Sequence, residues 1–360
     1  ASDVYKRQGK RISRISQKIA KNMRTRKVTI KDIATEAGVS IALVSFVMNN
    51  KADGKETYRV NKETAQRILE VAEKLNYQPN NAARTLRSGK TNTIGVIVSD
   101  ISNKFFADIA RCIEDRAYKH KYTVLFGSTD ENPQKLENLI EVFRNKGIDG
   151  LIIVPCEGAD EIIRDVALQN IPVVLLDREV PGSELSSVVL NNRRAGVETT
   201  QALIRQGFTR IEMISYSMNL SNIREREEGY RFCMTAAGLG NRINIHHLRH
   251  DKLGKIEEIV REAKMRNVEA FVFATNTLAA SGLTAIFRNG WRVPQDFAMA
   301  CFDSNEAFDI YKTAVAYVRQ PIEQFGTEAL DLLIKNIEQK NQPINSIRIC
   351  LLYTSDAADE

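Results

Sequence analysis

Between Thr93 and Asp303 the chain alternates short β-branched runs with helical patterns, and this alternation restricts the fold more than any other feature. The seven runs are TIGVIVSD (93–100), YTVLFGS (122–128), DGLIIVP (149–155), IPVVLLD (171–177), RIEMISY (210–216), EAFVFAT (269–275) and DFAMACFD (296–303). Strand-helix alternation predicts parallel sheets with right-handed crossovers, and these strands are too many for one small sheet. We therefore predict an α/β body of two doubly wound lobes.

Polar and aromatic side chains gather where these predicted strands end. Ligands of doubly wound sheets lie beyond the carboxyl ends of the strands, so these side chains are candidates for a binding cleft. Charged groups form strong hydrogen bonds to hydroxyls and a ring packs on the C–H face of a sugar, which indicates a polyhydroxy ligand. The alternative for each residue is a strand-end cap or a structural ion pair. The candidates are Asp100, Asn103, Phe105, Phe106, Asp177, Arg178, Arg224, Arg226, Asn276 and Asp303.

The segment TIKDIATEAGVSIALVSFVMN (29–49) has the pattern of two short helices joined by a sharp turn. Thr29 and Asp32 form a capping-box start, and Gly38 permits the turn. A third helix, from about Asn61 to Leu75, supplies an apolar stripe that closes a three-helix unit. The pattern predicts an all-α helix-turn-helix headpiece.

The next segment, NYQPNNAARTLRSGKT (76–91), contains a helix of only about two turns, because Pro79 starts it and Gly89 ends it. A helix this short is marginal in water by itself. We expect it to fold only when DNA and a symmetry mate hold it, as a hinge helix between headpiece and body.

Positive charge is concentrated at the N-terminal end. The 360 residues contain 51 Lys and Arg against 45 Asp and Glu, a formal net charge of +6. Residues 1–93 hold 20 Lys and Arg against 8 Asp and Glu, a balance of +12, and the remainder holds 31 against 37, a balance of −6. A basic end on a mildly acidic body is typical of a nucleic-acid-binding end attached to a body with another role.

The helix-turn-helix, together with the hinge motif Y-x-P-N-x-x-A-R-x-L, resembles the LacI family of transcriptional repressors over residues 28–349. The resemblance implies that the second helix enters the major groove, while paired hinge helices wedge leucines into the minor groove. Leu86 matches the wedge and Ala83 lies beside it. The positions that match contacts to the DNA backbone are Thr29, Ser40, Ser45, Asn49 and Asn80.

The groove-facing positions are Ile41, Ala42 and Phe46, where many relatives carry hydrogen-bonding side chains. Apolar side chains can read a thymine methyl but cannot make bidentate base contacts, so we expect greater reliance on phosphate contacts and DNA deformability. The loop 50–59 is longer than is usual in the family. Its Arg59, with Lys51 and Lys55, either contacts phosphates or belongs to a solvated turn.

For the body, the resemblance implies the periplasmic-binding-protein-like fold, with Arg226, Asn276 and Asp303 in the cleft and Phe106 as the ring. Thr277 departs from the Asp common in relatives, which changes the expected ligand chemistry. The implied function is a homodimeric DNA-binding repressor of a palindromic operator, controlled by a small-molecule effector, a sugar or sugar derivative. A purine or a partner protein is the alternative regulator, and the effector either induces or co-represses.

Neither end of the chain shows the regular spacing of apolar residues that is present in the adjoining segments. One coding sequence for residues 1–8 has a reverse complement that, shifted by one base, encodes CLLYTSDA (350–357), and it resembles a transposase adapter used in sequencing libraries. We expect residues 1–8 and 350–360 to be adapter-derived, with Met23 as the native start and a final strand from Ser346 that is truncated. The predicted domains are an N-terminal extension (1–26), the headpiece (27–77), the hinge and linker (78–92) and the body (93–349).

Other classes of protein are disfavoured. The sequence has neither an apolar run of about 18 residues nor a signal-peptide pattern, so we expect a cytoplasmic, nucleoid-associated bacterial protein without a membrane partner. Five scattered cysteines argue against disulfides or a thiolate zinc site. His246, His247 and His250 are interpreted as a solvated loop rather than a metal site. Because the sequence shows no recognisable arrangement of catalytic residues, we expect no enzyme activity, no cofactor and no metal.

Overall fold

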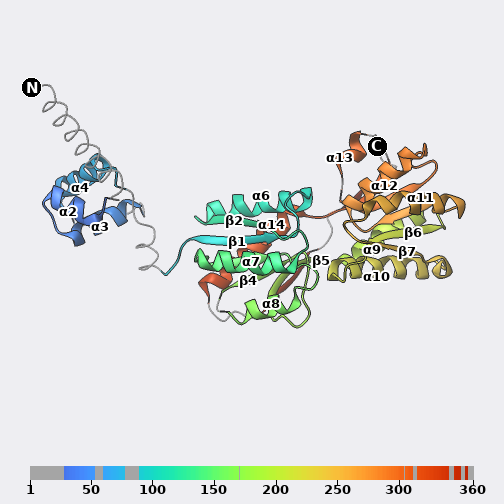
Figure 1. Ribbon diagram of the computed structural model, residues 1–360, viewed down its shortest axis with the longest axis horizontal. Helices are drawn as coiled ribbons and strands as arrows, with labels where there is room; N and C mark the ends of the chain where they lie inside the picture. Colours follow the sequence, from blue (N-terminus) through green and yellow to red (C-terminus); the bar gives the residue numbers. More distant parts are fainter. Residues whose placement is uncertain are drawn as a thin grey trace, which may run out of the picture. The chain divides into compact units, whose positions relative to one another are not determined.

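The computed structural model describes residues 28–52, 60–77, 89–169, 171–303, 305–310, 314–339, 344–349 and 353–355. The chain divides into two compact units, residues 1–89 and residues 90–360 (Figure 1). The predicted hinge helix, with Asn80, Ala83 and Leu86, lies outside the described residues, as does Arg59.

The headpiece consists of three helices, α2 (Ile30–Ala37), α3 (Ile41–Ala52) and α4 (Lys62–Lys74). Each helix contributes a fully buried side chain to one apolar cluster, namely Ile33, Val44 and Ile68. Because apolar residues recur at helical spacing on the facing sides, the three helices close around this core. The predicted three-helix unit is confirmed.

The predicted start and turn signals act as expected. The backbone N–H and the hydroxyl of Thr29 both donate to Asp32 Oδ2, at 2.8 Å each. Gly38 adopts a left-handed conformation with φ of 66° at the end of α2, where a side chain would be strained. The Leu43 N–H donates to Ser40 Oγ at 3.2 Å, so Ser40 caps α3.

Two helix boundaries differ from the sequence prediction. The loop was expected to begin at Asn50, but α3 continues to Ala52, since no Gly or Pro stands between Gly38 and Gly54. The third helix begins at Lys62 because Asn61 is its N-cap, accepting a hydrogen bond from the Glu63 N–H at 2.9 Å.

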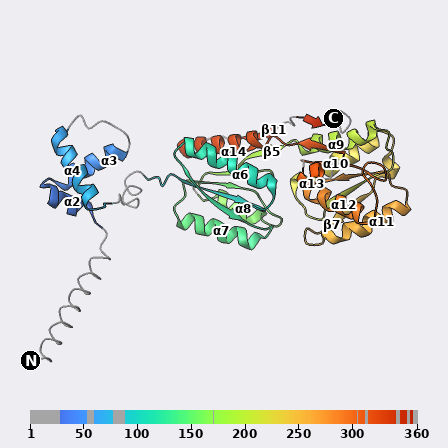
Figure 2. The same cartoon turned by 90° about the horizontal axis from the view of Figure 1, so that it is seen from above.

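Lobe 1 of the body is a parallel sheet covered by helices on both faces (Figure 2). Its elements are β1 (Thr93–Val98), α6 (Lys104–Lys119), β2 (Thr123–Ser128), α7 (Pro133–Asn145), β3 (Gly150–Ile153), α8 (Asp160–Ala167), β4 (Val173–Leu176), β5 (Ser186–Leu190), α14 (Ile322–Glu338) and β11 (Ser346–Ile349). The strand order is β11-β5-β4-β3-β1-β2. Separate apolar clusters lie under α6 and α14 and under α7 and α8.

Lobe 2 repeats this arrangement in the order β12-β10-β9-β8-β6-β7. Its elements are α9 (Asn192–Arg205), β6 (Ile211–Tyr216), α10 (Ser221–Ala236), β7 (Ile245–Leu248), α11 (Ile256–Met265), β8 (Ala270–Phe273), α12 (Asn276–Arg288), β9 (Ala298–Phe302), α13 (Glu306–Ile310), β10 (Val315–Arg319) and β12 (Tyr353–Ser355), with short 3₁₀ turns at Gly240–Arg242 and Leu253–Lys255. Its strands are parallel except β12, which runs antiparallel to β10.

All seven predicted runs form strands, and the predicted final strand from Ser346 is β11, paired with β5. Three internal strands were not predicted, because polar residues take the place of a continuous apolar run. These residues are serine in β5, histidine in β7, and tyrosine and arginine in β10. β12 falls in the C-terminal segment of the adapter prediction, whose origin stays a prediction.

The chain passes between the lobes twice within the described residues. The first crossing is Asn191–Asn192, between β5 and α9, and the second is Gln320–Pro321, between β10 and α14. Each crossing leads into a helix that covers the other lobe: α9 packs on β9 and β10, and α14 packs on β3, β4 and β5.

Two glycines let α9 and α10 approach backbone to backbone. A Cβ on Gly196 would overlap the Arg226 carbonyl oxygen, and a Cβ on Gly229 would overlap the Arg193 carbonyl oxygen. Only glycine fits such a contact. This close packing fixes the position of Arg226, on α10, relative to the first crossing.

Candidate functional site

A cavity of about 450 Å³ lies between the lobes, at the carboxyl ends of strands from both sheets; it is called the cleft below. Nine of the ten residues predicted from strand ends line it: Asp100, Asn103, Phe105, Phe106, Asp177, Arg178, Arg226, Asn276 and Asp303. The rule that ligands lie beyond the carboxyl ends of parallel strands therefore located the cavity.

The two lobes present an aspartate at equivalent positions. Asp177 directly follows β4 and Asp303 directly follows β9, with φ values of 65° and 62° in the left-handed region. Each donates its backbone N–H at 2.9 Å to the neighbouring strand, Asp177 to the Val188 carbonyl and Asp303 to the Val318 carbonyl. The shared strained turn aims both carboxyl groups into the cleft.

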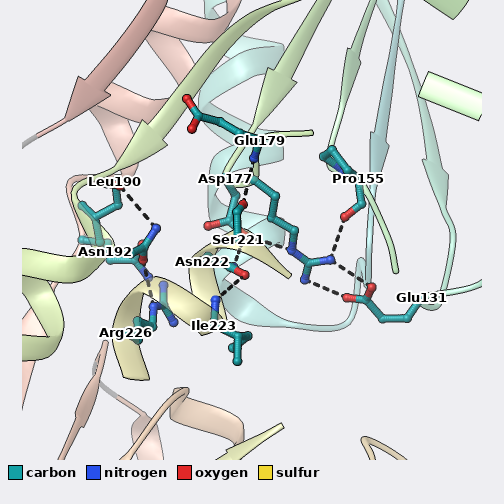
Figure 3. A network of polar contacts seen from close by, with 12 residues as sticks. Glu131, Pro155, Asp177, Glu179, Leu190, Asn192, Ser221, Asn222, Ile223 and Arg226 are labelled. Carbon is teal, nitrogen blue, oxygen red and sulfur yellow. Dashed lines mark hydrogen bonds and ion pairs between the residues drawn. The ribbon is translucent and has the colours of Figure 1, made fainter. Parts of the chain in front are cut away.

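Asp177 connects the lobes. Its Oδ2 accepts a hydrogen bond from Asn222 Nδ2 on α10 at 2.9 Å and lies 3.5 Å from Arg178 Nε (Figure 3). The Arg178 guanidinium is bound on its other side by both carboxylate oxygens of Glu131, at 2.7 and 2.9 Å, and by the Pro155 carbonyl at 2.8 Å. Arg178 is therefore held as part of the cleft wall.

Asp303 is bonded to the second crossing. Its Oδ1 accepts from the Gln320 backbone N–H at 3.0 Å, and its Oδ2 accepts from Gln320 Nε2 at 2.5 Å. A carboxylate that holds both the backbone and the side chain of one residue fixes the path of the chain between the lobes.

Arg226 lies between these aspartates and is 4% exposed. Its Nε donates to Asn192 Oδ1 at the first crossing, at 2.8 Å (Figure 3), and its Nη1 donates to the Ala274 carbonyl, also at 2.8 Å. The guanidinium stacks over the Phe302 ring at 4.1 Å from its centre. These contacts fix a planar donor group at the floor of the cleft.

Burial sets the direction of the pKa shift for three charged groups of the cleft. It raises the pKa of Asp177 and of Asp303, and it lowers the pKa of Arg226, although the opposite charges of these groups counteract the effect. Five acidic residues line the cleft against two arginines, the remaining acids being Asp100, Asp130 and Glu131.

Two buried acceptors in the cleft have no hydrogen-bond donor among the described residues. They are Asp177 Oδ1 and Gln320 Oε1, on residues that are 2% and 4% exposed. A buried acceptor without a donor costs free energy, so a bound molecule with O–H or N–H groups would be stabilised at these positions.

Further contacts join the lobes beside the cleft. The Glu179 N–H donates to Ser221 Oγ at 3.0 Å (Figure 3), and the Asn219 N–H donates to Glu157 Oε1 at 2.8 Å. Arg348 on β11 reaches Glu179 at 3.0 Å and Glu225 on α10 at 3.4 Å.

A second candidate surface lies on the headpiece, where the outward face of α3 carries Ile41, Ala42 and Phe46. Ile41 is 52% exposed and Phe46 is 38% exposed. Thr29 and Ser40 are exposed, and Ser45 is half-buried. Asn49 lies on α3, but its side chain falls outside the described residues.

Both units match family models. The model "Bacterial regulatory proteins, lacI family" matches residues 29–80, and "Periplasmic binding proteins and sugar binding domain of LacI family" matches residues 91–357. This chain belongs to the LacI family. Members of the LacI family are DNA-binding transcriptional regulators and not enzymes, so this chain is a transcriptional regulator.

Several LacI-family regulators are similar over most of their length. The chain is 30% identical to the transcriptional regulator RegA of Clostridium saccharobutylicum and to catabolite control protein A of Priestia megaterium, each over 87% of this chain and 93% of the relative. It is 30% identical to the ribose operon repressor of Halalkalibacterium halodurans, over 89% of this chain and 93% of that protein.

Solved structures agree on the fold. The Lac repressor dimer bound to operator and an anti-inducer has a TM-score of 0.77 at 20% identity, over 92% of this chain and 99% of that one. A putative ribose operon repressor from Burkholderia thailandensis has a TM-score of 0.67 at 28% identity, over 74% of this chain and 99% of that one.

One cleft residue predicted from the strand ends lies elsewhere. Arg224 is exposed and donates to Asn219 Oδ1 at 2.9 Å, away from the cleft. Residues two apart on a helix point about 200° apart, so Arg224 cannot share the inward face of α10 with Arg226. The prediction for Arg224 was wrong.

Two residues that line the cleft, Asn222 and Gln320, and one that holds Arg226, Asn192, were not predicted. Asn222 lies four residues before Arg226 on α10, so helical spacing could have identified it. Gln320 follows β10, a strand that was not predicted, and Asn192 begins a helix after the unpredicted β5. Their positions could not be inferred without those strands.

The histidine prediction needs correction. His246 and His247 lie on β7, an edge strand, where His246 Nε2 contacts Glu212 at 2.7 Å and His247 Nε2 contacts Glu227 at 3.0 Å. They lie on a strand against carboxylates of β6 and α10, and not in a solvated loop. Across the ranges that the structure describes, no group of His, Cys, Asp and Glu could hold a metal ion, and no helix has the length and apolar content of a membrane span.

Proposed function

We propose that this regulator binds a palindromic operator as a homodimer and that a neutral sugar or sugar derivative in the cleft controls this binding. One reading helix and one hinge helix per protomer suit a two-fold symmetric site. As a chromosomal regulator, the protein would act in the cytoplasm, in association with the nucleoid.

The pair of buried acceptors, Asp177 Oδ1 and Gln320 Oε1, carries the effector proposal. Hydroxyl groups of a sugar would donate to them, and the Arg226 guanidinium would donate to a sugar oxygen. Phe105 and Phe106 supply apolar surface for the C–H face of a ring, with their centres 5.0 Å apart. The excess of acidic residues in the cleft disfavours a phosphate-bearing effector.

Control of DNA binding would pass through the crossings. Asn192 is bonded to Arg226 and Gln320 to Asp303, so a ligand that shifts these cleft groups also shifts the segments on which the lobes turn. A change in lobe orientation would then align or separate the hinge helices, residues 78–92. A coupling of about 1–3 kcal/mol would change operator occupancy about five- to 150-fold.

Isothermal titration of the full chain with neutral sugars, their phosphates and purine bases tests the proposal. We expect binding of one neutral sugar, weaker binding of its phosphate, and weaker binding of the sugar in Asp177→Asn. Binding of a purine base alone would replace the sugar by the alternative effector. Failure of every small molecule, with operator affinity changed by a partner protein, would contradict the effector proposal.

A further inference from the structure

The outer face of α3 carries an apolar stripe that the packing of the headpiece does not use. Val44 and Val47, on the inner face, are 0% and 1% exposed, whereas Ile41 and Phe46 are exposed. In the described part of the headpiece, these two are the exposed large hydrophobic side chains. Exposed apolar side chains grouped on one helix face mark a contact surface.

The spacing makes the stripe continuous. Ile41 and Ser45 are four residues apart, as are Ala42 and Phe46, so the four side chains lie on one side of the helix. Ala42 is small, which lets the backbone of α3 approach a partner closely. The exposed Ser40, directly before α3, adds a hydroxyl group suited to a phosphate oxygen at the start of the stripe.

The charges of the headpiece do not explain how it would read a sequence. Residues 28–77 contain seven Lys and Arg and seven Asp and Glu, so this segment is neutral. Lys74 is additionally paired with Glu36 at 3.2 Å. The basic residues Arg24, Arg26, Lys27, Arg84, Arg87 and Lys90 flank this segment. Attraction to phosphates from these flanks gives affinity without sequence information.

The major groove offers one apolar group at the base edges of unmodified DNA, the C5 methyl of thymine. We infer that this protein selects its operator by packing Ile41 and Phe46 against thymine methyl groups, in place of hydrogen bonds from these positions to base edges. The inference rests on the proposed operator binding and names the chemical group that is read. It predicts half-sites with thymine at the positions under both side chains.

The test uses the full chain and a duplex selected from random sequence. Thymine is replaced by uracil, which removes only the methyl, at one symmetric pair of positions at a time, and affinity is measured by fluorescence anisotropy. Burial of one methyl corresponds to about a fourfold change in affinity, so a symmetric pair should lose about 15-fold. The loss is expected at no more than a few thymines of each half-site.

Variants assign each methyl to its side chain. Ile41→Ala and Phe46→Ala should each weaken binding to the thymine duplex and abolish the uracil effect at one position only. Leu168→Ala, which removes an 85% exposed apolar side chain from the body, is the matched control and should retain both effects. Circular dichroism verifies that the headpiece variants keep their helices.

Three outcomes separate the hypotheses. Sequence-specific binding that changes less than twofold with uracil at every thymine would overturn the methyl inference and leave operator binding intact. A uracil effect that persists in both headpiece variants would assign the reading to other residues and also overturn it. Absence of any sequence-specific binding would contradict the proposed operator binding, and the inference with it.

Discussion

The two lobes of the body have the same strand order but use equivalent positions differently. Asp177 in lobe 1 reaches across the cleft to Asn222 and keeps one carboxylate oxygen without a donor among the described residues. In Asp303 of lobe 2, both carboxylate oxygens accept hydrogen bonds from Gln320 at the second crossing. The repeated fold therefore supplies two aspartates, of which one suits ligand binding and the other suits the connection between lobes.

The helix pairs that follow the crossings, α9 with α10 and α14 with α6, also differ between the lobes. In lobe 2, Gly196 and Gly229 bring α9 and α10 into backbone contact, whereas in lobe 1 a Cβ on Gly326 of α14 would meet Cys112 Cβ of α6 at 2.6 Å. The overlap in lobe 1 is the smaller one, since each glycine of lobe 2 would place its Cβ 2.3 Å from a backbone carbonyl oxygen. The close contact lies in the lobe that carries Arg226, so lobe 2 is the less tolerant of change.

The largest expected effect tests this difference in tolerance. Gly229→Ala should lower the free energy of unfolding by about 3 kcal/mol, because its methyl would overlap backbone, and Gly326→Ala by about 1–2 kcal/mol. Urea unfolding of the full chain measures both values. Gly254→Ala, at an open position, is the control and should change stability by less than about 0.5 kcal/mol. Equal losses at Gly229 and Gly326 would refute the asymmetry.

The two aspartates should separate ligand binding from stability. Asp177→Asn should weaken binding of the effector about tenfold to a hundredfold, because it removes a charged acceptor, and should change unfolding by less than about 1 kcal/mol. Asp303→Asn should weaken binding and also destabilise by about 1 kcal/mol or more, because its amide cannot accept both bonds from Gln320. Calorimetric titration and urea unfolding of each variant give the comparison; identical behaviour would remove the proposed division of roles.

Lobe 2 contains an acid-sensitive ion pair, in which Glu212 on β6 contacts Arg266 and also His246. Burial would raise the pKa of Glu212, but hydrogen bonds from His246, Asn244 and Arg266 outweigh it and lower the pKa to about 2. A lowered pKa contributes stability that is complete above the ordinary value of 4.5 and is lost as the pH falls toward 2.

Glu212→Gln should therefore destabilise the protein by about 1–2 kcal/mol at pH 7. The difference from wild type should shrink between pH 4.5 and pH 2 in unfolding measured across that range. A difference independent of pH would mean that the carboxylate charge contributes nothing.

The smallest effect is expected at the rim of the cleft. Arg348→Ala removes the contacts from lobe 1 to Glu179 and Glu225, but the Arg348 side chain is 49% exposed and solvent weakens its ion pairs. The affinity for effector should change by less than about threefold. A tenfold change in the titration would show that the rim contacts, and not the cleft aspartates, set the closure of the lobes.

Much of the fold could be predicted from sequence because buried parallel strands leave continuous apolar runs, as in Val173–Leu176 and Ala270–Phe273. The edge strand β7 could not be predicted, because its sequence Ile-His-His-Leu is not an apolar run. Its histidines are accommodated by contacts with carboxylates on β6 and α10. Nine cleft residues followed from strand ends, but Gln320 depended on the unpredicted β10. Arg224 failed because its position on a helix was not considered.

Occupancy of the cleft is proposed to control DNA binding. The most direct measurement is the affinity of the full chain for its selected operator, by fluorescence anisotropy, with and without a saturating amount of the sugar identified by calorimetry. We expect a change of about five- to 150-fold, and a smaller change in Asp177→Asn at the same sugar concentration. An operator affinity that is unchanged when the wild-type cleft is saturated would contradict it.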